Sequence, residues 1–183
     1  LVREIDALGG LMGRAADAAC IQFRRLNTRK GLAVQASRAQ VDIDRYPRAV
    51  RETLAAIPTL TLVEGEVAAL RLRAGRISGI TLTDGTALDP PAVILTAGTF
   101  LAGVMHRGDE RAIGGRIGDG AAHELSRSLT ALGLRLGRLK TGTVPRLDGR
   151  TVDWDRLEVQ QDTIPDGRFS HGPPGPRLPQ ICC

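Results

Sequence analysis

Residues 92–100, AVILTAGTF, constrain the fold of this chain more than any other stretch. Val93, Ile94 and Leu95 form an apolar run without polar alternation, which is typical of a strand buried on both faces of a parallel sheet. The run ends at Gly98, where the backbone can turn sharply or lie close to a ligand. Ligands of open α/β sheets sit beyond the carboxyl ends of the strands, so this turn is a candidate binding site. The chain nevertheless has no G-x-G-x-x-G fingerprint.

The residues before this strand predict a β-meander. A buried strand is expected at 60–65, followed by two extended runs within 66–90. The Gly-bearing turns at 73–76 and 83–86 separate these runs, as tight turns do in a meander.

The two ends of the chain have simpler patterns. Apolar spacing predicts a helix over 1–19 that is interrupted at Gly9-Gly10, then a strand at 21–27. Residues 28–42 are expected to be a polar loop that leads into a helix at 45–57. Asp119 is a candidate cap for a helix at 121–132, and a strand with a polar loop is expected within 134–149. After residue 149 the pattern weakens into an irregular connection.

Composition narrows the class of partner. The net charge is +5, which suits a partner rich in phosphate, but lysine occurs only twice and such an arginine bias can equally reflect genome composition. No apolar run has the roughly 20 residues of a membrane helix. The three cysteines have neither metal-ligand nor disulfide spacing, which fits a reduced cytoplasmic protein without a metal site. Cys20 is expected to be a packed thiol.

Two polar loops could hold an anion. The GGRIGDG stretch at 114–120 resembles a phosphate cradle, although it fits neither the dinucleotide fingerprint nor a P-loop, and a plain surface loop is the alternative. RLKTGTVPR, at 138–146, places three cations around a turn, which suits a phosphate or a carboxylate; solvated turn residues are the alternative.

The order of strand, meander and glycine turn resembles the second half of the FAD domain of glutathione-reductase-type flavoproteins. The residues that fit are Glu66, Val67, Leu70, Gly79, Gly85, Val93 and Gly98. The resemblance implies an α/β fold, namely an incomplete FAD-binding, Rossmann-like domain with an inserted β-meander. Residues 1–149 would be part of that domain without its N-terminal G-x-G-x-x-G strand–helix unit. Residues 150–183 would begin an inserted NAD-binding or substrate region, or form an irregular connection.

Longer motifs narrow the family. The stretches at 6–27, 30–46, 93–103, 114–119 and 136–154 together resemble the tRNA uridine 5-carboxymethylaminomethyl modification enzymes, the MnmG/GidA family. The resemblance implies an FAD-dependent homodimer that works with an MnmE-type GTPase on the wobble uridine of certain tRNAs. NADH and methylene-tetrahydrofolate would be co-substrates. The basic charge would then serve a tRNA partner.

Site residues follow from the same resemblance. Those expected to contact FAD are Val67, Ala97, Gly98, Thr99, Arg116, Gly118 and Ala122, the last in place of a serine found in some members. Those expected on the substrate side of the flavin are Arg38, Gln40, Asp42, Lys140, Thr141, Gly142 and Arg146.

The family's two reactive cysteines would lie outside this stretch, so no catalytic residue is expected within it and these 183 residues alone are expected to be inactive. Three other functional hypotheses stay open: a folate- and FAD-dependent tRNA uridine-54 methyltransferase, a small-molecule flavin oxidoreductase, and a non-catalytic RNA-binding or scaffold fragment.

Overall fold

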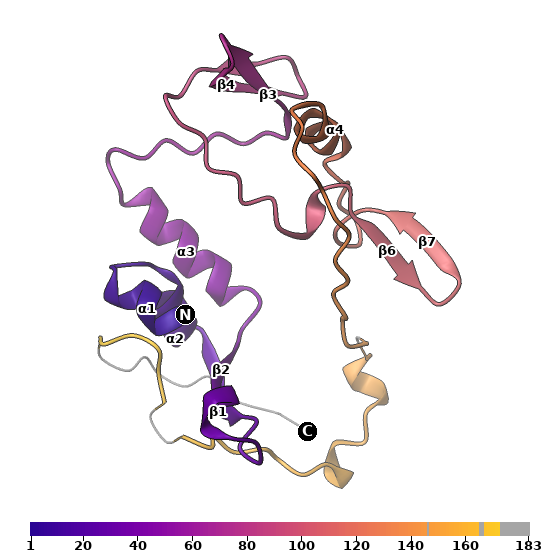
Figure 1. Cartoon of the computed structure of the whole chain (residues 1–183). Helices are drawn as coiled ribbons and strands as arrows, with labels where there is room; N and C mark the ends of the chain where they lie inside the picture. The colour runs from indigo at the N-terminus through magenta and orange to yellow at the C-terminus, as the bar shows by residue number, and fades with distance from the viewer. Residues whose placement is uncertain (146, 165–166, 173–183) are drawn as a thin grey trace. The chain divides into compact units, whose positions relative to one another are not determined.

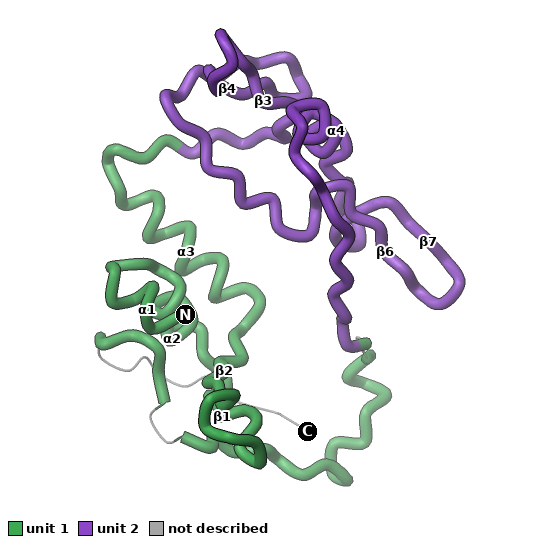
Figure 2. Tube along the Cα trace, in the orientation of Figure 1, with its two compact units in different colours: residues 1–61, 145–183 green, residues 62–144 purple. Residues whose placement is uncertain are grey.

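A computed structural model describes residues 1–145, 147–164 and 167–172 of the chain (Figure 1). It divides into two compact units, Leu1–Thr61 with Pro145–Cys183 and Leu62–Val144, which are described separately (Figure 2). Both helices and strands occur in the described residues, as the predicted α/β class requires. The expected domain boundary after residue 149 stays a prediction.

The first unit contains four helices or strands of the N-terminal stretch that the sequence predicted. Gly9, at a φ of +83°, ends the first helix, so the expected interruption is confirmed. Helix α3 confirms the expected helix after residue 44, with Pro47 in its first turn. The elements are α1 Val2–Ala7, α2 Met12–Ala18, β1 Cys20–Leu26, β2 Ala36–Val41 and α3 Arg45–Ala55, with short 3₁₀ turns η1 Leu32–Val34, η3 Gly149–Thr151 and η4 Trp154–Arg156.

The prediction of a polar loop over 28–42 is wrong for its second half. Residues 36–41 form strand β2, antiparallel to β1, with Ala36 opposite Leu26 and Gln40 opposite Gln22. Burial alternates along β2, with Ser37, Ala39 and Val41 on its more buried face. These inward residues are small or polar, so the period of two carries too weak a hydrophobic contrast to indicate a strand.

The core of the first unit lies where α2 meets β1 and where a distant stretch returns to both. Ala15, Ala19, Cys20 and Phe23 are buried, which confirms the packed role expected of Cys20. The Phe23 ring meets the Phe169 ring edge to face, with centroids 5.0 Å apart. Asp162 and Thr163 accept hydrogen bonds from the backbone N–H groups of Phe23 and Arg25, at 2.9 and 2.8 Å.

The second unit is built on an antiparallel sheet in the order β3-β4-β5, at the place where the sequence predicts a meander. Helix α4 packs against β3, and the backbone N–H of Leu70 donates to the Ser128 hydroxyl at 3.2 Å. Leu82, Leu125 and Leu129 are its buried leucines among the described residues. The elements are β3 Val67–Arg73, β4 Arg76–Leu82, β5 Ala87–Leu88, η2 Gly98–Phe100, β6 Val104–Arg107, β7 Glu110–Ile113 and α4 His123–Ala131.

Three strands that the sequence predicts do not form, one at the boundary between the two units and two after it. Residues 60–65, residues 92–97 and the described residues of 134–149 have no strand assignment, and Ile94 is 90% exposed. A strand needs a neighbour to pair its N–H and C=O groups, and no described residues pair with these stretches. The sequence did not predict the β6–β7 hairpin, which pairs Val104 with Ile113 and stands apart from the meander in Figure 1.

Candidate functional site

Three segments of the second unit meet at the start of α4. The backbone N–H of Ala122 donates to the Phe100 carbonyl at 2.9 Å, and the Ala122 carbonyl accepts from Ala102 at 3.3 Å. Gly114 donates to the Gly103 carbonyl at 3.0 Å. We call residues 97–103, 114–120 and 122 the glycine cluster, because glycines make this arrangement sterically feasible.

Three glycines of the cluster lie where a side chain would not fit. A Cβ at Gly103 would lie 2.6 Å from the Thr99 carbonyl oxygen, and a Cβ at Gly115 would lie 2.6 Å from the Phe100 ring. A Cβ at Gly114 would lie 2.5 Å from the Asp119 carbonyl oxygen. These three glycines therefore let the segments pack closely.

The other three glycines of the cluster, Gly98, Gly118 and Gly120, face open space. Gly98 has a φ of +60° and Gly118 a φ of +88°, both in the left-handed region that favours glycine. A Cβ at either position would meet no atom within 4 Å. The backbone of the cluster is thus close-packed on one side and accessible to a ligand at these two turns.

Asp119 closes the second of these turns and does not cap α4. Its carboxylate accepts from Arg116 Nε at 2.6 Å, and its N–H donates to the Arg116 carbonyl at 3.0 Å. Ala122 occupies the N-cap position without a side-chain hydrogen bond. The expected Asp119 cap is therefore wrong, because the carboxylate is engaged by Arg116 three residues before it.

The structure brings together six of the seven residues expected to contact FAD. Three belong to the η2 turn, two to the 114–120 loop and one to the start of α4: Ala97, Gly98, Thr99, Arg116, Gly118 and Ala122. Val67 begins β3, the strand against which α4 packs, and pairs with Leu82. Their contacts with a cofactor stay a prediction.

The residues expected on the substrate side fall in different units. Arg38 and Gln40 are exposed on β2 of the first unit. Lys140, Thr141 and Gly142 belong to an exposed stretch of the second unit without regular structure, and Arg146 lies outside the described residues. This stretch is tied to the glycine cluster through Arg138, whose Nη1 donates to the Ala102 carbonyl at 2.7 Å.

Asp42 has a structural role at the start of α3. Its carboxylate accepts from the backbone N–H of Arg45 at 2.8 Å and of Asp44 at 3.0 Å. These N–H groups, that of Arg45 first, hold the pKa of the Asp42 carboxyl below its ordinary value. Asp44, at the N-cap position itself, makes no side-chain cap hydrogen bond.

This capping predicts a dependence of stability on acid pH. Because the folded-state pKa of Asp42 is lowered, its contribution is fully present above the unfolded pKa of about 4. The contribution is lost as the pH falls through the folded value. We expect Asp42→Asn to reduce the difference in urea unfolding midpoint between neutral and acid pH. Asp44→Asn is the control; an equal reduction in that variant would contradict the assignment.

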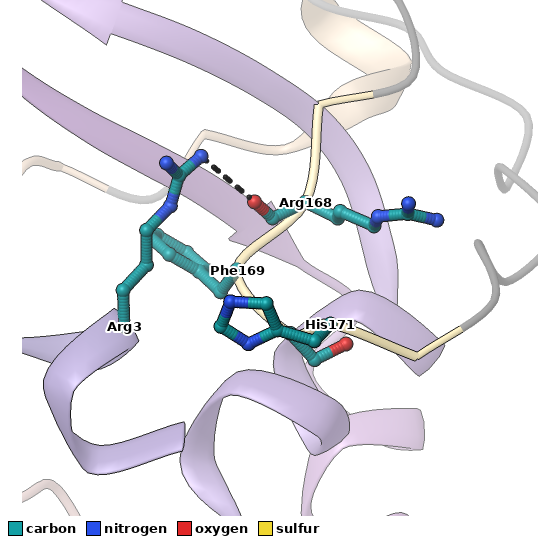
Figure 3. A pocket seen from close by; sticks show the side chains of 5 residues that line it. Arg3, Arg168, Phe169 and His171 are labelled. Atoms are coloured by element: carbon teal, nitrogen blue, oxygen red, sulfur yellow. Dashed lines mark hydrogen bonds between the residues drawn. The ribbon is translucent and has the colours of Figure 1, made fainter. Parts of the chain in front are cut away.

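A hollow in the first unit has no counterpart in the sequence motifs (Figure 3). It has a volume of about 250 Å³ and is lined by Arg3, Arg168, Phe169, Ser170 and His171. Arg3 donates to the Arg168 carbonyl at 3.2 Å, as the dashed line shows. His171 Nδ1 lies 2.8 Å from Asp6 Oδ2. This hydrogen bond holds the pKa of the Asp6 carboxyl below its ordinary value. No spacing in the sequence relates Asp6 to a histidine 165 residues away.

Within the described residues, no three His, Cys, Asp or Glu side chains gather in a way that could hold a metal ion. None of the helices described is both long and apolar enough to span a membrane.

The family model for "Glucose inhibited division protein A" matches residues 1–181. The chain belongs to this family. Similar curated proteins in the GidA family bear the name "tRNA uridine 5-carboxymethylaminomethyl modification enzyme MnmG". The protein from Myxococcus xanthus is 50% identical over 191 residues, which cover 100% of this chain and 31% of that protein. A protein from Thermus thermophilus is 50% identical over 99% of this chain and 30% of its own length.

A solved structure of Aquifex aeolicus GidA has the same fold. It matches 92% of this chain with a TM-score of 0.82 and 42% identity, and this chain covers 28% of it. The likeness confirms the predicted fold class, the α/β fold of a GidA protein. The chain spans about 30% of the length of the curated relatives that it matches.

Proposed function

We propose that this chain is the FAD-contacting part of an enzyme that adds a carboxymethylaminomethyl group to C5 of the wobble uridine of certain tRNAs. The names of its relatives and its membership of the GidA family support the reaction class. The geometry of the glycine cluster supports the cofactor.

The glycine cluster fits a dinucleotide cofactor at its open turns. Gly98 and Gly118 leave backbone uncovered at two neighbouring loops, and the second loop carries Arg116, an exposed guanidinium whose Nε pairs with Asp119. A bare backbone with a nearby guanidinium suits a pyrophosphate or another extended polar group. Bound there, FAD would supply two-electron redox chemistry, and the chain's own residues would hold and orient it.

Ala122 would contact such a cofactor only through atoms that remain available. It has no hydroxyl, and its N–H already donates to the Phe100 carbonyl. Its carbonyl accepts two hydrogen bonds, from the N–H groups of Ala102 at 3.3 Å and Ser126 at 3.4 Å, which occupy both lone pairs of the oxygen. We therefore expect Ala122 to contact the cofactor by van der Waals packing of its methyl group and not by a hydrogen bond.

The wider assembly belongs to the same proposal. NADH and methylene-tetrahydrofolate would be co-substrates, the protein would be a homodimer in the cytoplasm, and an MnmE-type GTPase would be its partner. The reactive cysteines would lie outside these 183 residues, which would therefore be inactive by themselves. Residues 1–149 would belong to the FAD-binding domain, and 150–183 would begin the inserted region or connect to it.

A matched pair of glycine variants tests the cofactor site in the protein that contains this chain. Gly98→Ala and Gly75→Ala both place a Cβ in open space at a left-handed φ, of +60° and +73°. Each should cost about 1 kcal/mol of backbone strain. Only the Gly98 variant should also lose flavin, because its methyl group would occupy the ligand side; we expect about tenfold weaker binding. Flavin absorbance per protein after gel filtration measures this.

Equal flavin retention in both variants would reject the cluster as the cofactor site. The position of the modification separates the remaining alternatives. Mass spectrometry of tRNA nucleosides should show loss of the wobble modification when the gene is deleted. A loss at uridine-54 instead would support the methyltransferase, and an unchanged tRNA would support a small-molecule oxidoreductase or a non-catalytic protein.

A further inference from the structure

The β1–β2 hairpin concentrates the positive charge of the chain. Residues 20–41, which we call the basic hairpin, contain five cations and no Asp or Glu. The charge of this hairpin therefore equals the net charge of the whole chain, +5. The cations are Arg24, Arg25, Arg29, Lys30 and Arg38. None of them forms an ion pair with any residue that the structure describes.

The register of the hairpin places two of these arginines against each other. Arg24 lies directly opposite Arg38, so both side chains leave the same face of the two strands. Arg25, the next residue, lies opposite Ser37 on the other face. Like charges at directly opposite positions destabilise a strand pair, and a bound anion would reverse this effect.

Arg24 is held in place before any ligand arrives. Its Nη1 donates to Gln160 Oε1 at 2.5 Å, and Gln22, only 1% exposed on the same face, donates to the Gln160 carbonyl at 3.2 Å. Arg24 Nε is out of contact with solvent and has no acceptor among the described residues. A partly desolvated guanidinium without a counter-charge is costly, which an oxyanion at its free donors would offset.

We propose that Arg24 and Arg38 together bind one phosphate group, and that this phosphate belongs to the backbone of the RNA substrate. Two planar guanidinium forks suit the several oxygens of a phosphate. Arg38 is exposed and completes the site from β2, whereas Arg24 is fixed by Gln160. The existence of the site does not depend on the proposed function; only the assignment of the phosphate to tRNA rests on it.

The site is tested first with inorganic phosphate, using thermal unfolding of the whole protein against chloride at equal ionic strength. Phosphate should raise the unfolding midpoint of the wild-type protein. Arg38→Gln should remove this rise and should raise the midpoint without phosphate, because it relieves the repulsion of Arg24. Arg25→Gln, the same charge change on the other face, should keep the phosphate effect. A full phosphate effect in Arg38→Gln, or an equal loss in Arg25→Gln, would overturn the proposal.

The source of the phosphate is tested by tRNA binding at several salt concentrations. Arg24→Gln and Arg38→Gln should each weaken binding about tenfold and reduce the salt slope by about one. Loss of the inorganic phosphate effect with unchanged tRNA binding would keep the site but overturn the RNA source in favour of a small phosphate compound. Flavin retention, measured in parallel, should stay at the wild-type level, so a failure of this site is distinguishable from a failure of the cofactor assignment.

Discussion

Replacing Asp17 with alanine is expected to release residues 168–171 from the first unit. Asp17 is 4% exposed, and its carboxylate accepts from the N–H of Phe169 at 2.9 Å and of Ser170 at 2.8 Å. It also accepts from the Ser170 hydroxyl at 2.6 Å. Alanine would leave these buried and part-buried donors without an acceptor, which we expect to cost about 3 kcal/mol. The cost is not larger because the segment can detach and let water hydrate the donors.

Hydrogen–deuterium exchange of peptides that cover residues 167–172 measures this release. A loss of about 3 kcal/mol corresponds to about a hundredfold faster exchange there. Asp109→Ala, which removes a carboxylate at an exposed position between β6 and β7, is the matched control and should leave exchange in this segment unchanged. Wild-type exchange in the Asp17 variant would show that other contacts, such as that of His171 with Asp6, suffice to hold the segment.

Replacing Phe23 with alanine is expected to destabilise the first unit most strongly. Phe23 is fully buried, its ring meets Phe169 edge to face at 5.0 Å, and Gly167 lies so close that a Cβ there would clash with the ring. Alanine would remove this packing and leave a cavity between β1 and residues 167–169. Large-to-small changes of this kind cost about 3–5 kcal/mol.

Urea unfolding of the protein, monitored with a probe in the first unit, measures the loss. Phe23→Leu refills most of the volume and should cost only about 1 kcal/mol, so the two variants differ in cavity size rather than in polarity. Equal losses in both variants would show that the aromatic contact with Phe169, and not the volume, dominates.

The candidate site was predictable in its membership more than in its geometry. The apolar run that ends in small residues indicates a turn at Ala97, Gly98 and Thr99. The cofactor role of Arg116 and Gly118 is a prediction from the family resemblance, because their glycine spacing alone also fits a plain surface loop. The sequence could not show that Gly103, Gly114 and Gly115 pack the segments together, since that requirement comes from atoms of distant residues. Asp119 likewise fits the sequence pattern of a helix cap, but its carboxylate accepts a hydrogen bond from Arg116 instead.

Expected strands failed for the opposite reason. Residues 92–97 have the apolar content of a buried strand, yet a strand exists only where a neighbour pairs its backbone, and no described stretch does so. Strand β2 forms despite its polar sequence, because β1 supplies that pairing. The hydrophobic pattern of a segment therefore indicates whether it could be buried. Whether the segment forms a strand depends on a second strand that pairs with its backbone.

Local spacing and glycine turns predict the helices α1, α2 and α3 and the positions of the strands β3 and β4, and the family resemblance predicts the α/β class. Contacts between distant residues establish that Asp6 and Asp17 hold residues 168–171, that Arg24 lies opposite Arg38, and that two loops meet at the start of α4. Those arrangements join residues far apart along the chain, and hydrogen bonds and packing between such residues leave no periodic signal in the sequence.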